Sequence, residues 1–534
     1  MRPGWRTATL AVRLDGPMLL STIVEASGQV AGTRSRIAKR TVIAAVIRSA
    51  RTPADAELAA LYLSGTLRQR RTGIGWRSLE SLPIAAADSS LTVAEVDHAL
   101  ETMSHLSGAG SATRRREHLE SLFGRATAAE QAYLRGLITG EVRQGALDGV
   151  LLDALGEAFD VPTDRIRRAA MVGASSAAVA HALVEEGETG LDRFSMRPGA
   201  PVRPMLAASA PDVATAMEAR NGAVAVDGKL DGIRLQAHLS REDDGTPQVR
   251  LFTRSLDDIT SRLPEVVEVV ADLPAATAIL DGEALVLKSG RPVPFQDSAA
   301  RTASSGNPEL LRQEWPLTVM FFDALHVDGQ DLIDLPARDR FAALAQVSPA
   351  YLVPRIVTDD LGEAEEFAAD MLVRGHEGVV IKDLDSVYAA GRRGAGWVKV
   401  KPRHTLDLVV LAVEWGSGRR TGMLSNIHLG ARDPSTGGFT MLGKTFKGMT
   451  DEMLRWQTRR FLELERSRSR AAVNLRPEQV VEIAFDGLQR SRRYPGGVAL
   501  RFARVLRYRD DKTAEEADTI GTVLDLARAT GVID

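Results

Sequence analysis

Apolar residues recur at helical spacing along the first part of the chain. The stretches SRIAKRTVIAAVIRSA, TVAEVDHALETMSHL, TAAEQAYLRGLIT and TDRIRRAAMVGA all carry this period, which gathers apolar side chains on one face of a helix. Three of them begin at Thr92, Thr127 and Thr163, whose hydroxyls can accept from the unpaired amides of a first helical turn. The pattern predicts an all-α domain at residues 1–195.

The pattern changes after the stretch RFSMRPGAPVRPML, residues 193–206. Its three prolines and one glycine disfavour a helix and indicate a linker. Beyond it lie short apolar runs bounded by Gly, Asp or Pro, as strands are: GAVAVDGK, QVRLFTRS, TAILDGEALVL, LTVMFFDALHV and EGVVIKD. Helical spacing returns in GEAEEFAADMLVRG. The mixture predicts an α+β domain at residues 205–402.

A third region, residues 403–534, contains five further runs typical of strands. They are DLVVLAVEWGSG, SNIHLGARD, GFTMLGKTF, QVVEIAFDG and ALRFARVLRYR, and the helical stretch TDEMLRWQTRRFLELE separates the third from the fourth. Five strands with an inserted helix are typical of a small β-barrel of the OB type. We therefore expect a multidomain protein that ends in an OB-fold domain.

One short motif in this region is misleading. GFTMLGKT, residues 438–445, has the spacing GxxxxGK[ST] of a phosphate-binding P-loop. A P-loop wraps phosphate with small residues and continues at once into a helix. Here the four loop residues are Phe, Thr, Met and Leu, and Gly448 interrupts any helix. We interpret the stretch as a strand of the barrel.

Composition limits the classes of function. Hydrophobic residues make up 44% of the chain and charged residues 26%, as in an ordinary soluble globular protein. There is no cysteine, which excludes disulfides, cysteine zinc sites and thiolate catalysis. No apolar run is long enough to span a membrane, so we expect a cytoplasmic protein without a membrane partner.

Two stretches of the chain carry basic residues and no acid, although the formal net charge is −3. Between Ser386 and Leu406 the charged residues are all Lys or Arg, and seven arginines lie between Gly487 and Arg509. A solvated charged face is the usual explanation of such a run. Two of them in a slightly acidic chain favour an anionic partner.

Seven motifs then follow one another in a fixed order. They are KLDGIR (229–234), FTRS (252–255), LDGEAL (280–285), FFDALHVDG (321–329), HEGVVIK (376–382), WVKVKP (397–402) and RFARVLRYRDDK (501–512). This ordered set resembles the nucleotidyltransferase superfamily of ATP-dependent DNA ligases and mRNA capping enzymes. Together with the helical N-terminal domain, it resembles an actinobacterial ATP-dependent DNA ligase of the B class.

The chemistry of the lysine motif can also be argued from the residues. An amine that attacks phosphorus must be neutral, whereas a free lysine has a pKa of about 10.4. Lys382, Lys399, Lys401 and a bound metal would supply positive charge that lowers the pKa of Lys229. The same charges would stabilise the α-phosphate in the transition state. Lys399 and Lys401 are two residues apart, so on a strand they share a face, with Val398 and Val400 toward the core.

The resemblance implies a role for each matching residue. Lys229 is the nucleophile that becomes adenylylated. Asp227 lies beside the adenine, where the family usually has glutamate, and Phe322 stacks on the base. Glu283 contacts the ribose, and Glu377 is the carboxylate linked to Mg²⁺. The remaining cations bind the nucleotide or the nick phosphate, and they are Arg234, Arg254, Lys382, Arg393, Lys399 and Lys401.

The resemblance also implies the substrate and the reaction. We expect a monomer that binds ATP and Mg²⁺ and seals nicks in duplex DNA through a lysyl-AMP intermediate, AMP transfer to the 5′-phosphate and attack by the 3′-hydroxyl. The helical domain resembles the DNA-binding domain of ligases that encircle a nick. Its stretch GEVRQGAL, residues 140–147, places Arg143 on the minor groove.

Three alternatives remain at this point. A capping or RNA-ligating enzyme shares the lysine motif but does not usually carry the large helical domain. An NAD-dependent ligase would be expected to have a cysteine zinc finger, and this chain has no cysteine. A silent nick-binding protein would not need an intact Lys229. Labelled ATP, GTP or NAD would separate them by which one leaves an acid-stable label on the protein.

Overall fold

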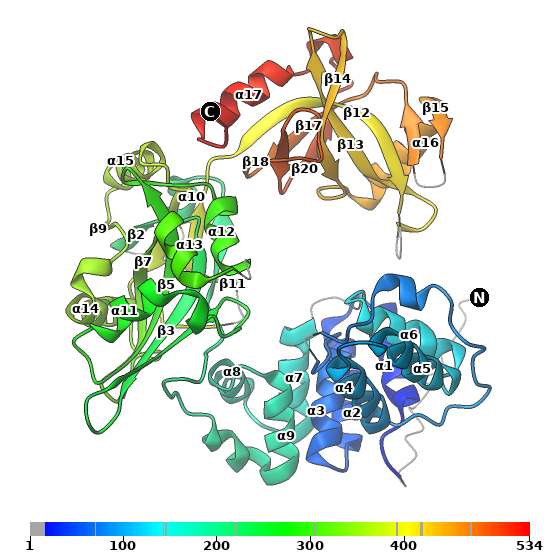
Figure 1. The fold of residues 1–534 in the computed structure, drawn as a ribbon, viewed down its shortest axis with the longest axis vertical. Coiled ribbons are helices and arrows are strands. Elements are labelled where there is room, and N and C mark those ends of the chain that lie inside the picture. Colours follow the sequence, from blue (N-terminus) through cyan, green and yellow to red (C-terminus); the bar gives the residue numbers. More distant parts are fainter. Residues whose placement is uncertain are drawn as a thin grey trace. The chain divides into compact units, whose positions relative to one another are not determined.

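The computed structural model describes residues 16–69, 71–142, 144, 147–218, 220, 222–303, 306–390, 393–416, 420–469 and 472–533. The chain divides into two compact units (Figure 1). The first comprises residues 1–204 with 389–391, and the second comprises residues 205–388 with 392–534. The predicted boundary at residue 402 falls inside the second unit and stays a prediction.

The first unit is built of helices around one hydrophobic core. Thr92 and Thr127 precede helices α4 and α6, and both form the reciprocal capping box with the glutamate three residues on. The cap predicted at Thr163 is wrong, because Thr163 is already the first residue of its helix and Pro162 precedes it. The described residues of this unit form nine α-helices, which are α1 (Leu20–Gly32), α2 (Arg36–Ser49), α3 (Pro53–Leu63), α4 (Val93–His105), α5 (Ser111–Gly124), α6 (Ala128–Ile138), α7 (Leu147–Phe159), α8 (Thr163–Val172) and α9 (Ser176–Glu186).

The second unit begins with two sheets. The five-stranded sheet has the order β1-β11-β10-β2-β9, and a six-stranded sheet has the order β4-β3-β5-β7-β8 with β6 beside β5. The first comprises β1 (Leu206–Ala210), β2 (Val224–Gly228), β9 (Arg355–Thr358), β10 (Val379–Asp383) and β11 (Arg393–Val400). The second comprises β3 (Ile233–Arg241), β4 (Pro247–Thr253), β5 (Thr277–Lys288), β6 (Arg291–Pro292), β7 (Leu317–Val327) and β8 (Gln330–Asp331).

Helices cover the two sheets and complete their cores. Apolar residues of α11 and α14 pack with the six-stranded sheet, and those of α10 and α15 pack with the five-stranded sheet. The bounds are α10 (Val213–Glu218), α11 (Pro264–Ala271), α12 (Phe295–Ala303), α13 (Pro308–Glu314), α14 (Ala337–Val347) and α15 (Leu361–Val373). The predicted α+β character is confirmed. The chain passes from one sheet to the other between β2 and β3, at residues 229–232.

The C-terminal part is the predicted OB-type barrel. Its seven-stranded sheet is formed by β12 (His404–Trp415), β13 (Leu424–Asp433), β14 (Gly438–Thr445), β15 (Glu465–Arg468), β16 (Ala472–Leu475), β17 (Val480–Phe485) and β20 (Arg504–Tyr508). Strands β18 (Gly487–Arg490) and β19 (Val498–Arg501) pair separately, and α16 (Asp451–Glu463) and α17 (Ile520–Ala529) complete the domain. The P-loop look-alike is strand β14, paired with β13, as expected.

Two details of the barrel differ from the sequence expectation. The β15–β16 hairpin was not foreseen. The run ALRFARVLRYR forms two strands rather than one, because Phe502 takes a φ of 55° and breaks the extended chain between β19 and β20. A positive φ is uncommon for residues other than glycine, because it strains the backbone.

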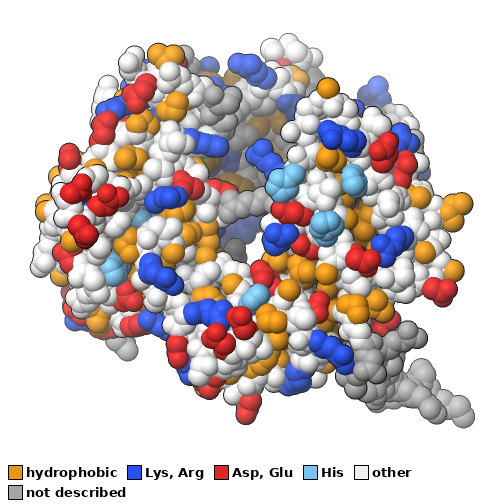
Figure 2. Space-filling model, turned by 60° about the horizontal axis from the view of Figure 1, so that its bottom comes forward, with side chains coloured by type: hydrophobic (Ala, Val, Ile, Leu, Met, Phe, Trp, Pro, Cys, Tyr) orange, Lys and Arg blue, Asp and Glu red, His pale blue; other side chains and the backbone are white. Residues whose placement is uncertain are grey.

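Charge is mixed on the surface. On the face in Figure 2, Lys and Arg side chains are interspersed with Asp and Glu and do not form one large patch. Among the described residues, no helix combines the length and the apolar character that crossing a membrane requires.

The core of the two-sheet region contains a fully buried ion pair. Nε of Arg340 on α14 donates to Asp323 on β7 at 2.8 Å, and Nη2 donates to the other carboxylate oxygen at 3.0 Å. Both side chains are 0% exposed. A charge left unpaired in such a place is costly, because no water can replace its partner.

We therefore predict that Arg340→Met lowers the free energy of unfolding by about 3–5 kcal/mol. The midpoint of urea denaturation, followed by tryptophan fluorescence, measures it. Arg338→Met is the matched control, because Arg338 lies on the same helix but pairs with Asp385 at an exposed position, where an ion pair contributes little. Equal midpoints for the two variants would contradict the prediction.

Candidate active site

A single pocket brings most of the predicted site residues together. Its volume is about 740 Å³, within the usual range for small-molecule sites. Ten of the eleven predicted residues line it: Asp227, Lys229, Arg234, Arg254, Glu283, Phe322, Glu377, Lys382, Lys399 and Lys401. The backbone of Arg393 lies in β11 beside Leu206, but its side chain is outside the described part of the structure. Arg143 also lies outside the described residues.

The lining carries an excess of positive charge. Seven of its residues are Lys or Arg and five are Asp or Glu. The excess suits a polyphosphate ligand, because desolvated cations attract anions far more strongly than exposed ones do.

Lys229 lies in the turn that joins the two sheets. Its amide donates to the carbonyl of Gly378 at 2.8 Å, and its carbonyl accepts from the amide of Glu377 at 2.9 Å. Gly378 has a φ of +132°, and a Cβ there would lie 2.3 Å from the carbonyl oxygen of Val400. A Cβ at Gly232 would likewise meet the carbonyl of Ala284 at 2.4 Å. The two glycines let the segments of the site approach this closely.

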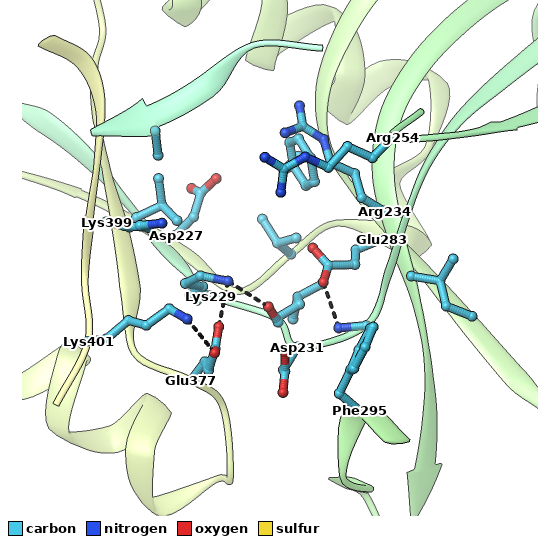
Figure 3. Close-up of a pocket in the computed structure, with 18 of the residues that line it drawn as sticks. Asp227, Lys229, Asp231, Arg234, Arg254, Glu283, Phe295, Glu377, Lys399 and Lys401 are labelled. Carbon is cyan, nitrogen blue, oxygen red and sulfur yellow. Dashed lines mark hydrogen bonds and ion pairs between the residues drawn. The ribbon is translucent and has the colours of Figure 1, made fainter. Parts of the chain in front are cut away.

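The side chain of Lys229 is paired with a carboxylate (Figure 3). Its Nζ lies 2.6 Å from Oε2 of Glu377 and donates to the carbonyl of Leu230 at 3.1 Å. Lys401 donates to the other oxygen, Oε1 of Glu377. Both lysines therefore point toward one carboxylate. The two backbone hydrogen bonds of Lys229 hold the segment that carries Glu377 in place.

The expectation of a lowered lysine pKa is wrong for this arrangement. Burial by itself lowers the pKa of Lys229, but the carboxylates of Glu377 and Glu283 outweigh burial and raise it. Burial raises the pKa of Glu377, but Lys229 and Lys401 outweigh it and lower that pKa. The pair is thus ionised, and Lys229 is a cation. The sequence motifs indicated which cations lie near Lys229. They did not show which carboxylate pairs with which cation.

Lys399 and Lys401 behave as their spacing predicts. Both line the pocket, whereas Val398 and Val400 are 9% exposed and belong to the core of the five-stranded sheet. Burial, and then repulsion from Lys401 and Lys229, lowers the pKa of Lys399. The alternation of strand side chains therefore delivers both lysines to one side of β11 and its end.

Asp227 is held between two cations rather than left open. Arg355 donates through Nε to Oδ1 at 2.5 Å and through Nη2 to Oδ2 at 2.8 Å. Nζ of Lys382 lies 2.7 Å from Oδ2. Burial raises the pKa of Asp227, but Lys382 and Arg355 outweigh burial and lower it. Lys382 therefore pairs with Asp227. Its positive charge, which was expected to act on Lys229, is compensated by that carboxylate.

Sequence reasoning missed Arg355. It lies in the short edge strand β9, and only the register of the sheet places it opposite Asp227. No motif of the sequence marks it.

Arg234 is held just as firmly. It donates to both oxygens of Asp281 at 3.1 and 2.6 Å and to the carbonyl of Met205 at 2.7 Å. The buried Tyr388 donates to Asp281 at 2.9 Å. Asp281 belongs to the quoted LDGEAL motif. It is two residues from Glu283, and this spacing could have identified it as a site residue. No pattern in the sequence could have identified Tyr388.

Aromatic rings surround these cations. The ring of Phe322 meets Trp397 edge to face at 5.8 Å, and Nζ of Lys382 lies 4.7 Å and 4.4 Å from their centroids. Arg234 also lies over both rings. Trp397 belongs to the quoted WVKVKP motif but was not predicted as a site residue. Cations packed on rings in this way are further fixed in place.

The remaining predicted carboxylate and the barrel complete the pocket. Glu283 accepts from the amide of Gly232 at 2.6 Å, and burial raises its pKa. From the barrel, Arg501 donates to Asp231 at 2.9 Å, and Phe502 also lines the pocket. Lys512 of the same motif instead lies 2.6 Å from Asp407.

The donor set for a divalent metal is small. Among the described residues, no three His, Asp or Glu side chains are grouped as metal ligands. Glu377 therefore stands as a single carboxylate. Mg²⁺ commonly binds through one or two carboxylates with water and phosphate oxygens completing its shell, so this arrangement fits the ion.

Fold and site define a multidomain enzyme with a lysine at a cation-rich pocket. Its sequence matches the models for the ATP dependent DNA ligase domain at residues 204–401, the ATP dependent DNA ligase C terminal region at residues 420–512 and the DNA ligase N terminus at residues 78–156. The chain belongs to the ATP-dependent DNA ligase family. It is therefore a ligase that uses ATP and acts on DNA, and not a capping enzyme or an NAD-dependent ligase.

Relatives extend this match over almost the whole chain. A probable DNA ligase of Beutenbergia cavernae is 58% identical over 520 residues, which cover 96% of this chain and 100% of that protein. One of Kineococcus radiotolerans is 58% identical over 516 residues, with the same coverage. The solved structure Pmar-Lig_PreS3 is 17% identical, has a TM-score of 0.63 and covers 91% of this chain and 99% of its own. That likeness shows the fold.

We predict that Glu377→Gln lowers the pKa of Lys229. The carboxylate of Glu377 attracts the ammonium and favours its charged form, and the neutral amide does not. Titration of ¹³C-labelled lysine by NMR measures this pKa. Glu414→Gln is the matched control, because Glu414 pairs with Lys444 in the barrel and does not contact Lys229. An unchanged pKa in Glu377→Gln would contradict the assigned pair.

Proposed function

We propose that this ligase seals nicks in duplex DNA in three steps with Lys229 as the nucleophile. The observation that supports it is the place of Lys229, whose amine lines a 740 Å³ pocket together with Lys399 and Lys401. The proposed domains are the DNA-binding domain at 1–195, the adenylation domain at 205–402 and the OB-fold domain at 403–534.

In the first step, Nζ of Lys229 gives its proton to solvent and, as a neutral amine, attacks the α-phosphorus of ATP. The phosphorus–nitrogen bond forms, the bond to the bridging oxygen of the β-phosphate breaks, and pyrophosphate leaves with that electron pair. Lys399 and Lys401 stabilise the negative charge on the phosphate oxygens in the transition state. In the second step AMP passes from Lys229 to the 5′-phosphate. In the third, the 3′-hydroxyl attacks that phosphate and AMP leaves.

The charge state of Lys229 makes Glu377 central to the first step. While Glu377 pairs with Lys229, the amine stays protonated and cannot attack. Glu377 is also the residue that would hold Mg²⁺, whose positive charge would offset the carboxylate and the phosphates of ATP. Once Glu377 faces another cation, burial and the neighbouring Lys399 and Lys401 favour the neutral amine.

The other residues are assigned to parts of the nucleotide. Phe322 stacks on adenine, Asp227 accepts from its amino group, and Glu283 binds the ribose. The side chains that bind the phosphates of ATP or of the nick are Arg234, Arg254, Arg393, Lys399 and Lys401. Because Asp281 and Met205 already hold Arg234, it meets a phosphate as a fixed donor and loses little entropy on binding.

The DNA partner is assigned to the helical unit and the basic stretches. The helical domain binds the duplex around the nick, with Arg143 at the minor groove, and the protein works as a monomer. Because basic and acidic side chains are interspersed on the face in Figure 2, contact with DNA depends on local groups of cations, and the affinity falls as salt rises.

We expect Lys229→Ala to abolish both the acid-stable labelling by ATP and the sealing of a nicked duplex. No other group would supply the phosphoramidate nitrogen, so the loss should be complete. Binding to nicked DNA, measured by fluorescence anisotropy, should survive. Lys288→Ala, at an exposed lysine at the end of β5, is the control and should label normally. Label retained on Lys229→Ala would remove Lys229 from the mechanism.

The motif RFARVLRYRDDK leads to a separate prediction. Lys512 and Arg509 both pair with Oδ2 of Asp407, in the segment 402–407 where the chain enters the barrel and which we propose as a hinge. We propose that the barrel swings so that this motif orients the departing pyrophosphate, a closure that assembles the site for the first step.

Lys512→Ala should then slow adenylylation of Lys229 at least about tenfold more than it slows sealing of a nick already carrying AMP, because pyrophosphate leaves only in the first step. Single-turnover assays of the two reactions measure the ratio. Lys444→Ala, which also removes a barrel lysine paired with a carboxylate, should leave the ratio unchanged. An equal loss in both reactions would assign Lys512 to folding or DNA binding.

A further inference from the structure

The pair between Arg355 and Asp227 is unusual in its placement. Asp227 lines the pocket, whereas Arg355 is not among the lining residues. Arg355 approaches from β9, at the edge of the sheet and directly opposite Asp227 in register. Its guanidinium lies 3.6 Å from the ring centroid of Phe341 and donates to the carbonyl of Phe322 at 2.9 Å. It is therefore held from several sides, and it acts on the pocket through the side chain of Asp227 and the backbone of Phe322.

The donors around Asp227 leave its two oxygens unequal. An ionised carboxylate has about four acceptor positions, two on each oxygen. Oδ2 accepts from Nη2 of Arg355 and lies 2.7 Å from Nζ of Lys382, so both of its positions are used. Within the described residues, Oδ1 accepts from Nε of Arg355 at 2.5 Å and has one position left. The side chain thus offers a single acceptor position to a ligand in the pocket.

We infer that Arg355 is a positioning residue that sets the base specificity of the ligase. By gripping both oxygens of Asp227, it fixes the direction of the one remaining acceptor position. An exocyclic amino group, as at carbon 6 of adenine, can donate to that position. A carbonyl oxygen at the same carbon, as in hypoxanthine or guanine, would face a carboxylate oxygen without a proton between them, which is unfavourable.

This inference rests on the proposed function, because it takes Asp227 to lie beside the base. It adds that Asp227 alone is not enough. An aspartate side chain can rotate about two bonds. The planar guanidinium of Arg355 donates to both carboxylate oxygens and so restricts that rotation. A lysine at position 355 keeps the charge but donates as a point, so it should hold Asp227 without fixing its direction.

The test compares ATP with inosine triphosphate, which carries a carbonyl in place of the amino group. We expect Arg355→Lys to reduce the ratio of kcat/KM for ATP to that for inosine triphosphate at least about tenfold, with adenylylation of Lys229 as the readout. The change should appear mainly in KM, because the reacting atoms are untouched. A loss of activity equal for both nucleotides would overturn the inference.

Arg340→Lys is the matched control. It alters another two-pronged pair, the more deeply buried Arg340 with Asp323, in the same region but away from the pocket lining. It should lower stability and leave the nucleotide ratio unchanged. If Arg340→Lys changes the ratio as much as Arg355→Lys, the effect is a general loosening of the domain and the inference fails.

We expect the Arg355 variants to fold. Lys382 still lies beside Asp227 when Arg355 is replaced, so the carboxylate is not left without a counter-charge. Arg355→Gln serves as a second variant that keeps a planar donor but loses the charge. We expect its nucleotide ratio to lie between those of the wild type and Arg355→Lys, and a ratio equal to that of the wild type in both variants would overturn the inference.

A third variant separates this inference from the assignment of Asp227. Asp227→Asn replaces one carboxylate oxygen with an amide donor. If Asp227 faces the base, this variant should strongly lower the ratio of kcat/KM for ATP to that for inosine triphosphate. If Asp227→Asn leaves the ratio unchanged, the proposed place of Asp227 is wrong and the inference falls with it. If Asp227→Asn collapses the ratio but the Arg355 variants do not, Asp227 is correctly placed and only the role of Arg355 is refuted.

Discussion

The tie between Lys229 and Glu377 is the interaction on which the rest of the site depends. Two backbone hydrogen bonds join the turn after β2 to the segment before β10, and the two side chains then meet at 2.6 Å. The turn of Lys229 also leads from β2 into β3, so the tie anchors the point at which the chain passes from one sheet to the other. A change in this turn would therefore disturb Lys229, its counter-charge and the junction of the sheets together.

In the mechanism that we propose, the pairing also keeps the nucleophile inactive. A buried lysine without a partner would tend to lose its proton, and one beside a carboxylate keeps it. The structure holds Lys229 in the charged form, in which it is stable but cannot attack. Under that proposal, activation would require a new partner for Glu377, and a metal held by Glu377 would supply one. The release of Lys229 would then be coupled to the arrival of the nucleotide.

Much of the architecture was predictable because it depends on local patterns. Helical spacing, the linker prolines and the alternating runs of β12, β13 and β14 are short-range signals. The ordered motifs contain nine of the predicted pocket residues, and Asp227 lies two residues before the first motif. Thr163 failed as a cap because Pro162 can take that position, and Phe502 broke a predicted strand through a backbone angle that sequence does not reveal. Arg355 and Tyr388 were missed because each meets its partner only after distant strands are placed in register. The lysine pKa was misjudged for the same reason, since a charge balance depends on which groups touch.

The cations in and behind the pocket fall into two groups with different surroundings. Arg355 and Lys382 are bound to Asp227, and Arg234 is bound to Asp281, so these three side chains are fixed by partners inside the protein. Lys229 and Lys401 share one carboxylate, and Lys399 is close enough to both for repulsion to lower its pKa. Among these cations, positive charge is therefore least compensated at the lysine end of the pocket. An anionic ligand would place its phosphates there and its base at the end where charges are already balanced, because a neutral ring gains nothing from an unpaired cation and a phosphate gains much.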